Sequence, residues 1–110
     1  MFGVCDGHGS NGEDISRIAV VALPYYVSLD PYYTTMPKKA LRKACLKTDQ
    51  TLTRKAVDHK KSGSTACVGL IIGSDLYVAN VGDSRLVVVR RFKKNFQALQ
   101  VTRDHAPDEP

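Results

Sequence analysis

The stretch that decides the fold class is residues 64–92, STACVGLIIGSDLYVANVGDSRLVVVRRF. It holds three runs rich in apolar and β-branched residues, separated by Gly73-Ser74-Asp75 and by Gly82-Asp83-Ser84. Both separators have turn compositions, and strands joined by such short turns predict an antiparallel meander. The middle run, residues 76–80, is apolar with little alternation, so we expect it to be buried on both faces.

One strand and one helix are expected near the start of the chain. Residues 1–5 form a short apolar run that ends at Asp-Gly, which is typical of a buried strand. Ser10 and Glu13 have the spacing of a capping box, which predicts a helix with Ser10 as its N-cap. Pro24 should kink or split this helix because it removes a backbone donor, and Asp30-Pro31 should end it.

A second helix is expected from Pro37, because proline suits the first position of a helix. Its apolar stripe consists of Leu41, Cys45, Thr48 and Leu52, with Ala44 and Ala56 beside it. A last strand is expected at residues 96–102, after the basic turn Lys93-Lys94-Asn95. The order of one strand, two helices and several hairpin-linked strands predicts an α+β fold.

Length, charge and cysteine content limit the class of protein. The chain has 110 residues and a net charge of +5, which fits at most one small domain. We interpret Cys5, Cys45 and Cys67 as structural residues of a reducing compartment, because they are odd in number and lack CxxC spacing. No apolar run reaches the roughly 18 residues of a membrane span, and no signal peptide is recognisable. We therefore expect an intracellular protein, in the cytoplasm, the nucleus or both. The basic excess of residues 38–61 lacks an aromatic platform, so we interpret it as a solvated helix face rather than a nucleic-acid surface.

The residues best suited to chemistry are Asp6-Gly7-His8-Gly9, directly after the first strand. The carboxylate of Asp6 and a neighbouring backbone carbonyl offer oxygen ligands to a hard cation such as Mg²⁺ or Mn²⁺. The imidazole of His8 could donate a proton to a leaving group near neutral pH. The alternative is a polar turn in which Asp6 caps backbone N–H groups, and the pattern alone does not decide between the two.

Asp83 repeats this arrangement after a second strand. Its alternative is a hairpin turn in which Asp83 bonds its own backbone and Arg85 pairs with Asp83 or a neighbour. We interpret His59 as solvent-facing and His105 as structural, with its ring fixing a loop by hydrogen bonds. No nucleophile motif is present, which fits hydrolysis by metal-activated water.

Four motifs, FGVCDGHG, GSTACVGLI, LYVANVGDSR and VTRDHAP, occur in an order that resembles the metal-dependent serine/threonine protein phosphatases of the 2C type. The resemblance implies part of a four-layer α-β-β-α sandwich with antiparallel sheets. It also implies hydrolysis of phosphoserine and phosphothreonine in proteins, with two core Mg²⁺ or Mn²⁺ ions and a third, looser ion. By this resemblance Asp6 bridges the core metals, the Gly7 carbonyl binds one of them, His8 is the general acid and Asp83 holds the third metal. Residues 63–65 are structural by the same resemblance.

The family also has metal ligands and a phosphate-binding arginine on segments that these 110 residues do not supply. We therefore expect residues 1–110 to be the central part of a single phosphatase catalytic domain, and to be inactive alone. Its partner would be a phosphorylated protein substrate, with no nucleic acid and no membrane, and the oligomeric state stays open. The alternative function is a catalytically inactive, phosphatase-like regulatory or interaction module.

Overall fold

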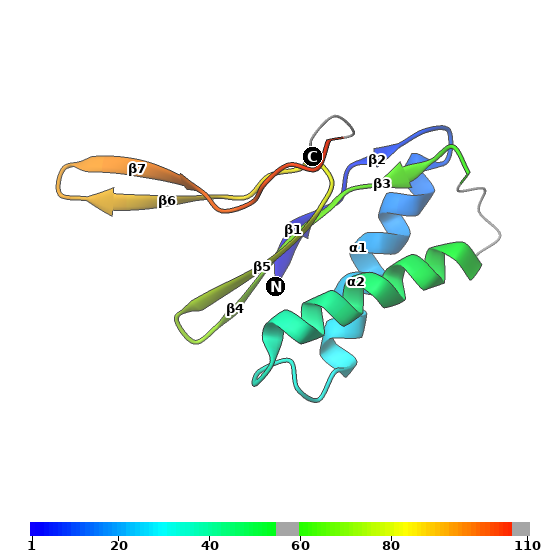
Figure 1. The fold of residues 1–110 in the computed structure, drawn as a ribbon, viewed down its shortest axis with the longest axis horizontal. Coiled ribbons are helices and arrows are strands. Elements are labelled where there is room, and N and C mark those ends of the chain that lie inside the picture. Colours follow the sequence, from blue (N-terminus) through cyan, green and yellow to red (C-terminus); the bar gives the residue numbers. More distant parts are fainter. Residues whose placement is uncertain (55–59, 107–110) are drawn as a thin grey trace.

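The structure is a computed structural model that describes residues 1–54 and 60–106. A three-stranded antiparallel sheet lies at its centre, in the order β1-β4-β5 (Figure 1). These strands are β1 (Phe2–Val4), β4 (Ala66–Ile72) and β5 (Asp75–Val81). The tight turn that joins β4 to β5 contains Gly73 at a φ of 62°, a backbone conformation that favours glycine. The predicted hairpin at Gly73-Ser74-Asp75 is thus confirmed.

The other two sheets are two-stranded ribbons. Strand β2 (Gly7–His8) pairs with β3 (Gly63–Ser64), and β6 (Val87–Phe92) pairs with β7 (Asn95–Gln100). No pairing joins β5 to β6 in the described part of the chain, and the β6–β7 hairpin projects away from the central sheet (Figure 1). The predicted meander is therefore wrong at Gly82-Asp83-Ser84, because these residues form a loop that carries the chain out of the sheet rather than a hairpin turn.

The two helices are α1 (Gly12–Leu29) and α2 (Pro37–Arg54), and they pack on each other and on one side of the sheet. Helix α2 begins at Pro37 as predicted. Helix α1 is one continuous element through Pro24, so of the predicted kink or split the split does not occur. The flanking Leu23 and Val27 are buried in the core, which offsets the lost backbone bond.

The capping box predicted for Ser10 and Glu13 is also wrong. The N-cap of α1 is Asn11, and its side chain makes no capping bond. Instead, the Asn11 N–H donates to Ser62 Oγ at 3.0 Å, and the Gly12 N–H donates to the Gly9 carbonyl at 3.2 Å. A neighbouring loop and a turn therefore satisfy the first two backbone donors at the start of the helix.

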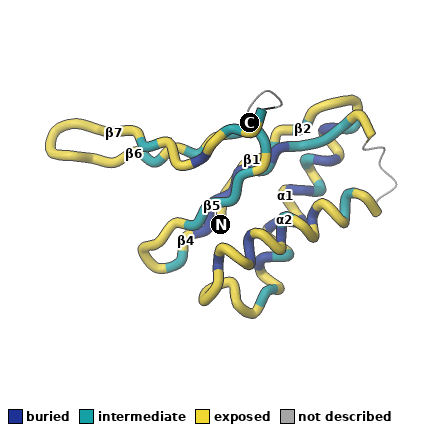
Figure 2. The backbone as a smooth tube through the Cα atoms, in the orientation of Figure 1, coloured by how far each residue is buried: buried dark blue, intermediate teal, exposed yellow. Residues whose placement is uncertain are grey.

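The core lies between the helices and one face of the sheet. It is built from Leu23, Val27, Leu41, Ala44, Val68 and Leu70, with Cys5 and Cys45 packed against it. The helices lie on one side of the sheet (Figure 2). On the other face Ile71 is 59% exposed. Strand β1 is exposed and no residue of β5 is fully buried, so the predicted burial of residues 1–5 and 76–80 is wrong. Both strands are sheet edges, and the helices cover only one face.

The α+β class is confirmed, and the four-layer sandwich remains a prediction for a longer domain. All three cysteines are free, with Cys67 buried and Cys5 and Cys45 half-buried. Neither helix of the described residues is long and apolar enough to cross a membrane.

Candidate functional site

The backbone of Asp6 is fixed by Thr65 on the opposite strand. The ladders β1–β4 and β2–β3 share one register, in which Asp6 lies across from Thr65. The Thr65 N–H donates to the Asp6 carbonyl at 3.0 Å, whereas the Asp6 N–H donates to Thr65 Oγ1 at 2.9 Å. The Thr65 carbonyl accepts instead from Ser64 Oγ at 2.8 Å. Thr65 is buried and Asp6 is exposed, so a fixed backbone presents the Asp6 carboxylate to solvent.

Thr65 also contacts the loop that contains Asp83. Its hydroxyl lies 2.7 Å from Ser84 Oγ, so one buried hydroxyl bonds to the Asp6 backbone and to the neighbour of Asp83. Gly82 lies so close that an added Cβ would stand 2.8 Å from Thr65 Cγ2, and its φ of 102° also requires glycine. The two aspartate turns therefore converge on Thr65, which the sequence pattern alone could not establish.

The segment around His105 holds the same loop from its other side. The Gly82 N–H donates to His105 Nδ1 at 3.1 Å, and the His105 N–H donates to the Gly82 carbonyl at 2.8 Å. Asn80 Nδ2 donates to the Gly82 carbonyl at 3.3 Å and to the Arg103 carbonyl at 3.0 Å. The prediction that the ring of His105 fixes a loop by hydrogen bonds is confirmed.

Arg85 pairs with Asp104 rather than with Asp83. Its Nη2 and Nε lie 2.8 and 3.2 Å from the two carboxylate oxygens. Hydrogen bonding to Arg85 lowers the pKa of Asp104, and the same hydrogen bond raises the pKa of Arg85. No hydrogen bond or ion pair is found for the side chain of Asp83 among the described residues, so its exposed carboxylate is available as a ligand.

Two glycines allow β2 to approach its neighbours closely. A Cβ on Gly7 would lie 2.1 Å from the Gly12 carbonyl oxygen, so β2 sits directly on the first turn of α1. A Cβ on Gly63 would lie 2.8 Å from His8 Nε2, so the imidazole lies against the bare backbone of β3. His8 itself is exposed. The Asp-Gly-His-Gly segment is thus held between α1 and β3 and leaves its carboxylate and imidazole accessible.

The oxygen donors of the candidate site are of the type that binds a hard cation, but they are too few to fill its coordination shell. The Asp6 carboxylate and the Gly7 carbonyl are oxygen donors, which Mg²⁺ and Mn²⁺ prefer. In residues 1–54 and 60–106, however, no group of three or more His, Cys, Asp or Glu side chains is placed to hold a metal ion. Asp6, Gly7 and Asp83 can therefore supply part of a coordination shell, and the other ligands must come from solvent or other segments.

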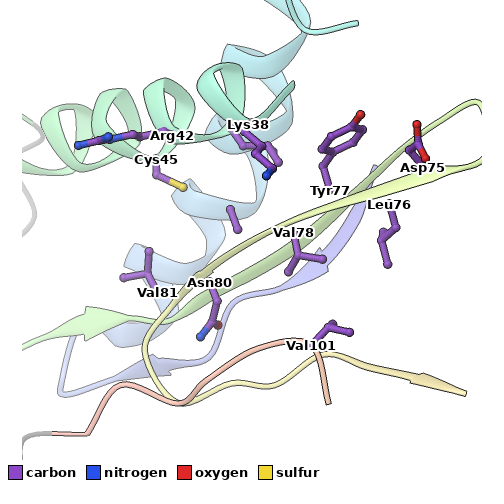
Figure 3. A pocket seen from close by; sticks show the side chains of 12 residues that line it. Lys38, Arg42, Cys45, Asp75, Leu76, Tyr77, Val78, Asn80, Val81 and Val101 are labelled. Carbon is purple, nitrogen blue, oxygen red and sulfur yellow. The ribbon is translucent and has the colours of Figure 1, made fainter. Parts of the chain in front are cut away.

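A large hollow of the described residues lies away from this site. A groove of about 780 Å³ lies between α2 and β5 and includes Lys38, Arg42 and Asp75 (Figure 3). None of Asp6, His8 and Asp83 lines it. Its walls are α2 and the edge strand β5, which has no further strand beside it among the described residues, so we attribute the groove to an uncovered sheet edge rather than to catalysis.

The cysteines do not take part in the candidate chemistry. Burial raises the pKa of the thiols of Cys5, Cys45 and Cys67, and the proximity of Cys45 raises that of Cys5 further. Thiolate is therefore scarce near neutral pH, as expected for structural cysteines.

The sequence pattern points to the exposed candidate side chains but not to the residues that join their loops. Thr65, Ser84 and Asn80 were assigned only to turns or strands, yet their hydrogen bonds bring the two aspartate loops together. Thr65 could have been noticed because it directly precedes a buried apolar strand, where a buried hydroxyl needs hydrogen-bond partners. His59 lies outside the described residues.

Nearly the whole chain is similar to known proteins. The family model described as "Protein phosphatase 2C" matches residues 1–110. "Probable protein phosphatase 2C 35" of Arabidopsis thaliana is 36% identical over 107 residues, which are 97% of this chain. Human "Protein phosphatase 1F" is 37% identical over 108 residues, also 97% of this chain. The chain spans only 31% and 22% of the lengths of these two relatives.

Proposed function

Because this chain belongs to the protein phosphatase 2C family, we propose that it is part of a domain that hydrolyses phosphoserine and phosphothreonine in proteins. The observation that carries the proposal is the convergence of the Asp6 and Asp83 loops on Thr65. This convergence places two exposed carboxylates on loops with a shared anchor, as a metal-dependent hydrolase requires.

Each residue has a proposed role. The Asp6 carboxylate and the Gly7 carbonyl bind the core Mg²⁺ or Mn²⁺ ions, and Asp83 binds a third, looser ion. These ions, when bound, supply an activated water and neutralise phosphate charge. His8 holds a proton for the departing serine or threonine oxygen, and its exposed position beside β3 leaves it accessible to a substrate.

We propose further that residues 1–110 are the central part of one catalytic domain that completes a four-layer α-β-β-α sandwich. Support comes from the relatives, of which the chain spans about a third or less, and from the open face of the sheet. The missing metal ligands and a phosphate-binding arginine would lie on other segments of the longer protein.

The test is phosphatase activity of the longer protein toward a phosphoserine peptide with Mn²⁺. Asp6→Asn should lower kcat at least about a hundredfold, since it removes a ligand charge. Asp75→Asn changes another exposed aspartate, outside the site, and is the matched control that should leave kcat unchanged. An Asp6→Asn protein with normal activity would contradict the proposal.

His8→Asn separates proton donation from metal binding. It should slow phosphoserine hydrolysis about a hundredfold or more, and affect p-nitrophenyl phosphate much less, because p-nitrophenolate leaves without a proton. Equal losses with both substrates would contradict the role as general acid. If the longer protein lacks Asp6-dependent turnover altogether, the alternative of an inactive phosphatase-like module is correct.

A further inference from the structure

Helix α1 has a second apolar surface besides the one that faces the core. Residues 18–29 contain no charged side chain. Val21 is 69% exposed, Tyr25 55% and Leu29 57%, and their spacing of four residues aligns them along the helix. We call these three residues the outer strip. A surface helix normally carries charged residues on its exposed face, so an apolar strip of this length points to a partner.

A hollow adjoins the outer strip where α1 meets α2. It measures about 420 Å³ and is lined by Arg17, Ile18, Val21, Ala22, Tyr25, Tyr26 and Thr51. The rings of Tyr25 and Tyr26 meet edge to face at 5.4 Å, and the Tyr26 hydroxyl lies 2.6 Å from Thr51 Oγ1. The hollow is therefore mostly apolar, with one hydroxyl pair at its wall, and its volume suits an inserted side chain.

The rim of the hollow on α2 is basic. Lys47 Nζ lies 5.8 Å from the centre of the Tyr26 ring. Lys43, Lys47 and Arg54 share a helix face with Thr51 by their spacing, and all three are exposed. None of them forms an ion pair with a described residue. Acidic groups on a partner would thus meet available cations beside the apolar strip.

We propose that the outer strip and the adjoining hollow bind an acidic peptide segment that carries large apolar side chains. Charge complementarity selects this partner, because a second copy would bring like-charged lysines together in a two-fold contact. A concave hollow with a hydroxyl pair favours an inserted side chain over a flat lipid surface. The surface is separate from Asp6, His8 and Asp83, so the inference does not depend on the phosphatase activity.

Fluorescence anisotropy tests the proposal directly. The probe is a short fluorescein-labelled amphipathic helix with leucines on one face and glutamates on the other, titrated in EDTA with the full chain. We expect saturable, salt-sensitive binding. Val21→Glu and Lys47→Glu should each weaken it about tenfold or more, since each removes one of the two complementary features. Tyr25→Ser, a milder change in the strip, should weaken it in the same direction.

Val20→Glu is the matched control, because Val20 is 48% exposed on the same helix but lines a different hollow, beside Phe2. Its binding should equal that of the unchanged chain, with circular dichroism used to check that all variants fold. The proposal is overturned if Val21→Glu binds normally, or if a probe with lysines in place of glutamates binds equally well. It is also overturned if only phosphatidylserine vesicles bind, or if Val21→Glu instead abolishes self-association seen by sedimentation.

Discussion

At the scale of single residues, Thr65 determines how the two aspartate loops lie relative to each other. Its hydroxyl accepts from the Asp6 N–H and bonds to Ser84, while its methyl group packs on Gly82. A buried hydroxyl with two partners is costly to replace by an apolar group, because both partners lose a bond. We therefore regard Thr65 as a positioning residue for Asp6, acting through the backbone rather than by contact with substrate.

Two substitutions of Thr65 distinguish the effect of its hydroxyl group from the effect of its side-chain shape. Thr65→Val keeps the shape and should destabilise the fold by about 1–3 kcal/mol through the two lost bonds. It should also weaken Mn²⁺ binding by the longer protein, because the Asp6 N–H loses its partner and only the bond from the Thr65 N–H to the Asp6 carbonyl remains. Thr65→Ser keeps the hydroxyl, should cost about 1 kcal/mol for the lost methyl group, and should bind Mn²⁺ normally.

Urea unfolding and calorimetric Mn²⁺ titration measure the two effects separately. Ser84→Ala is the control for the link to the Asp83 loop, since it leaves the bond from the Asp6 N–H to Thr65 Oγ1 in place. Equal Mn²⁺ affinities for Thr65→Val and Thr65→Ser would show that Thr65 has only a structural role.

The sequence pointed to exposed candidate residues of the site but not to its internal bonds. Asp6, His8 and Asp83 became candidates because reactive side chains beside glycines after strands form a local pattern, although that pattern alone does not distinguish a metal site from a polar turn. The link from Thr65 to Ser84 joins residues 19 positions apart, and that from Asp6 to Thr65 joins residues 59 apart. Such pairings depend on sheet register, which no local pattern specifies.

At the scale of secondary-structure elements, the contact of β2 with the start of α1 fixes the position of the Asp-Gly-His-Gly segment. Gly7 and Gly12 face each other so closely that a Cβ on Gly7 would stand 2.1 Å from the Gly12 carbonyl oxygen. That oxygen belongs to a helix backbone, so it cannot turn aside as a flexible side chain would. The contact replaces the predicted capping box in defining how the helix begins.

Gly7→Ala tests this contact. It should destabilise the fold by about 3 kcal/mol, because either β2 or the first turn of α1 must move. Gly73→Ala is the matched control: nothing lies within 4 Å of its added Cβ, and its φ of 62° limits the cost to about 1 kcal/mol of backbone strain. Urea unfolding of both variants measures the difference. A Gly7→Ala variant as stable as Gly73→Ala would show that the strand and helix separate without cost.

The positions of the helices and strands were largely predictable from the sequence, but the burial of the strands was not. Pro37 marked the start of α2, and the composition of Gly73-Ser74-Asp75 marked a hairpin, because both signals are local. Residues 76–80 were expected to be buried on both faces because their sequence is apolar. An apolar composition allows a strand to be buried on both faces, but the strand is buried only where other helices or strands cover it, and β5 is covered on one face only.

At the scale of the whole molecule, the described residues leave much of the sheet uncovered. One sheet face is uncovered, β5 is an open edge, and the β6–β7 hairpin projects with Phe96 73% exposed. The curated relatives are about three times as long as this chain or longer. The small number of metal ligands and the uncovered sheet both lead us to expect that the isolated chain is inactive.

We expect the isolated 110-residue chain to bind Mn²⁺ with a Kd of about 1 mM or weaker and to show no Asp6-dependent turnover. The reason is that Asp6, Gly7 and Asp83 supply too few ligands to hold two doubly charged ions in a fixed geometry. Calorimetric titration and hydrolysis of a phosphoserine peptide are the measurements, with Asp6→Asn as the reference for background. Adding the remaining segments of the longer protein in trans should restore turnover, and restoration should fail when the chain carries Asp6→Asn. Mn²⁺-stimulated turnover by the isolated chain that disappears in Asp6→Asn would show instead that these residues form a complete catalytic centre.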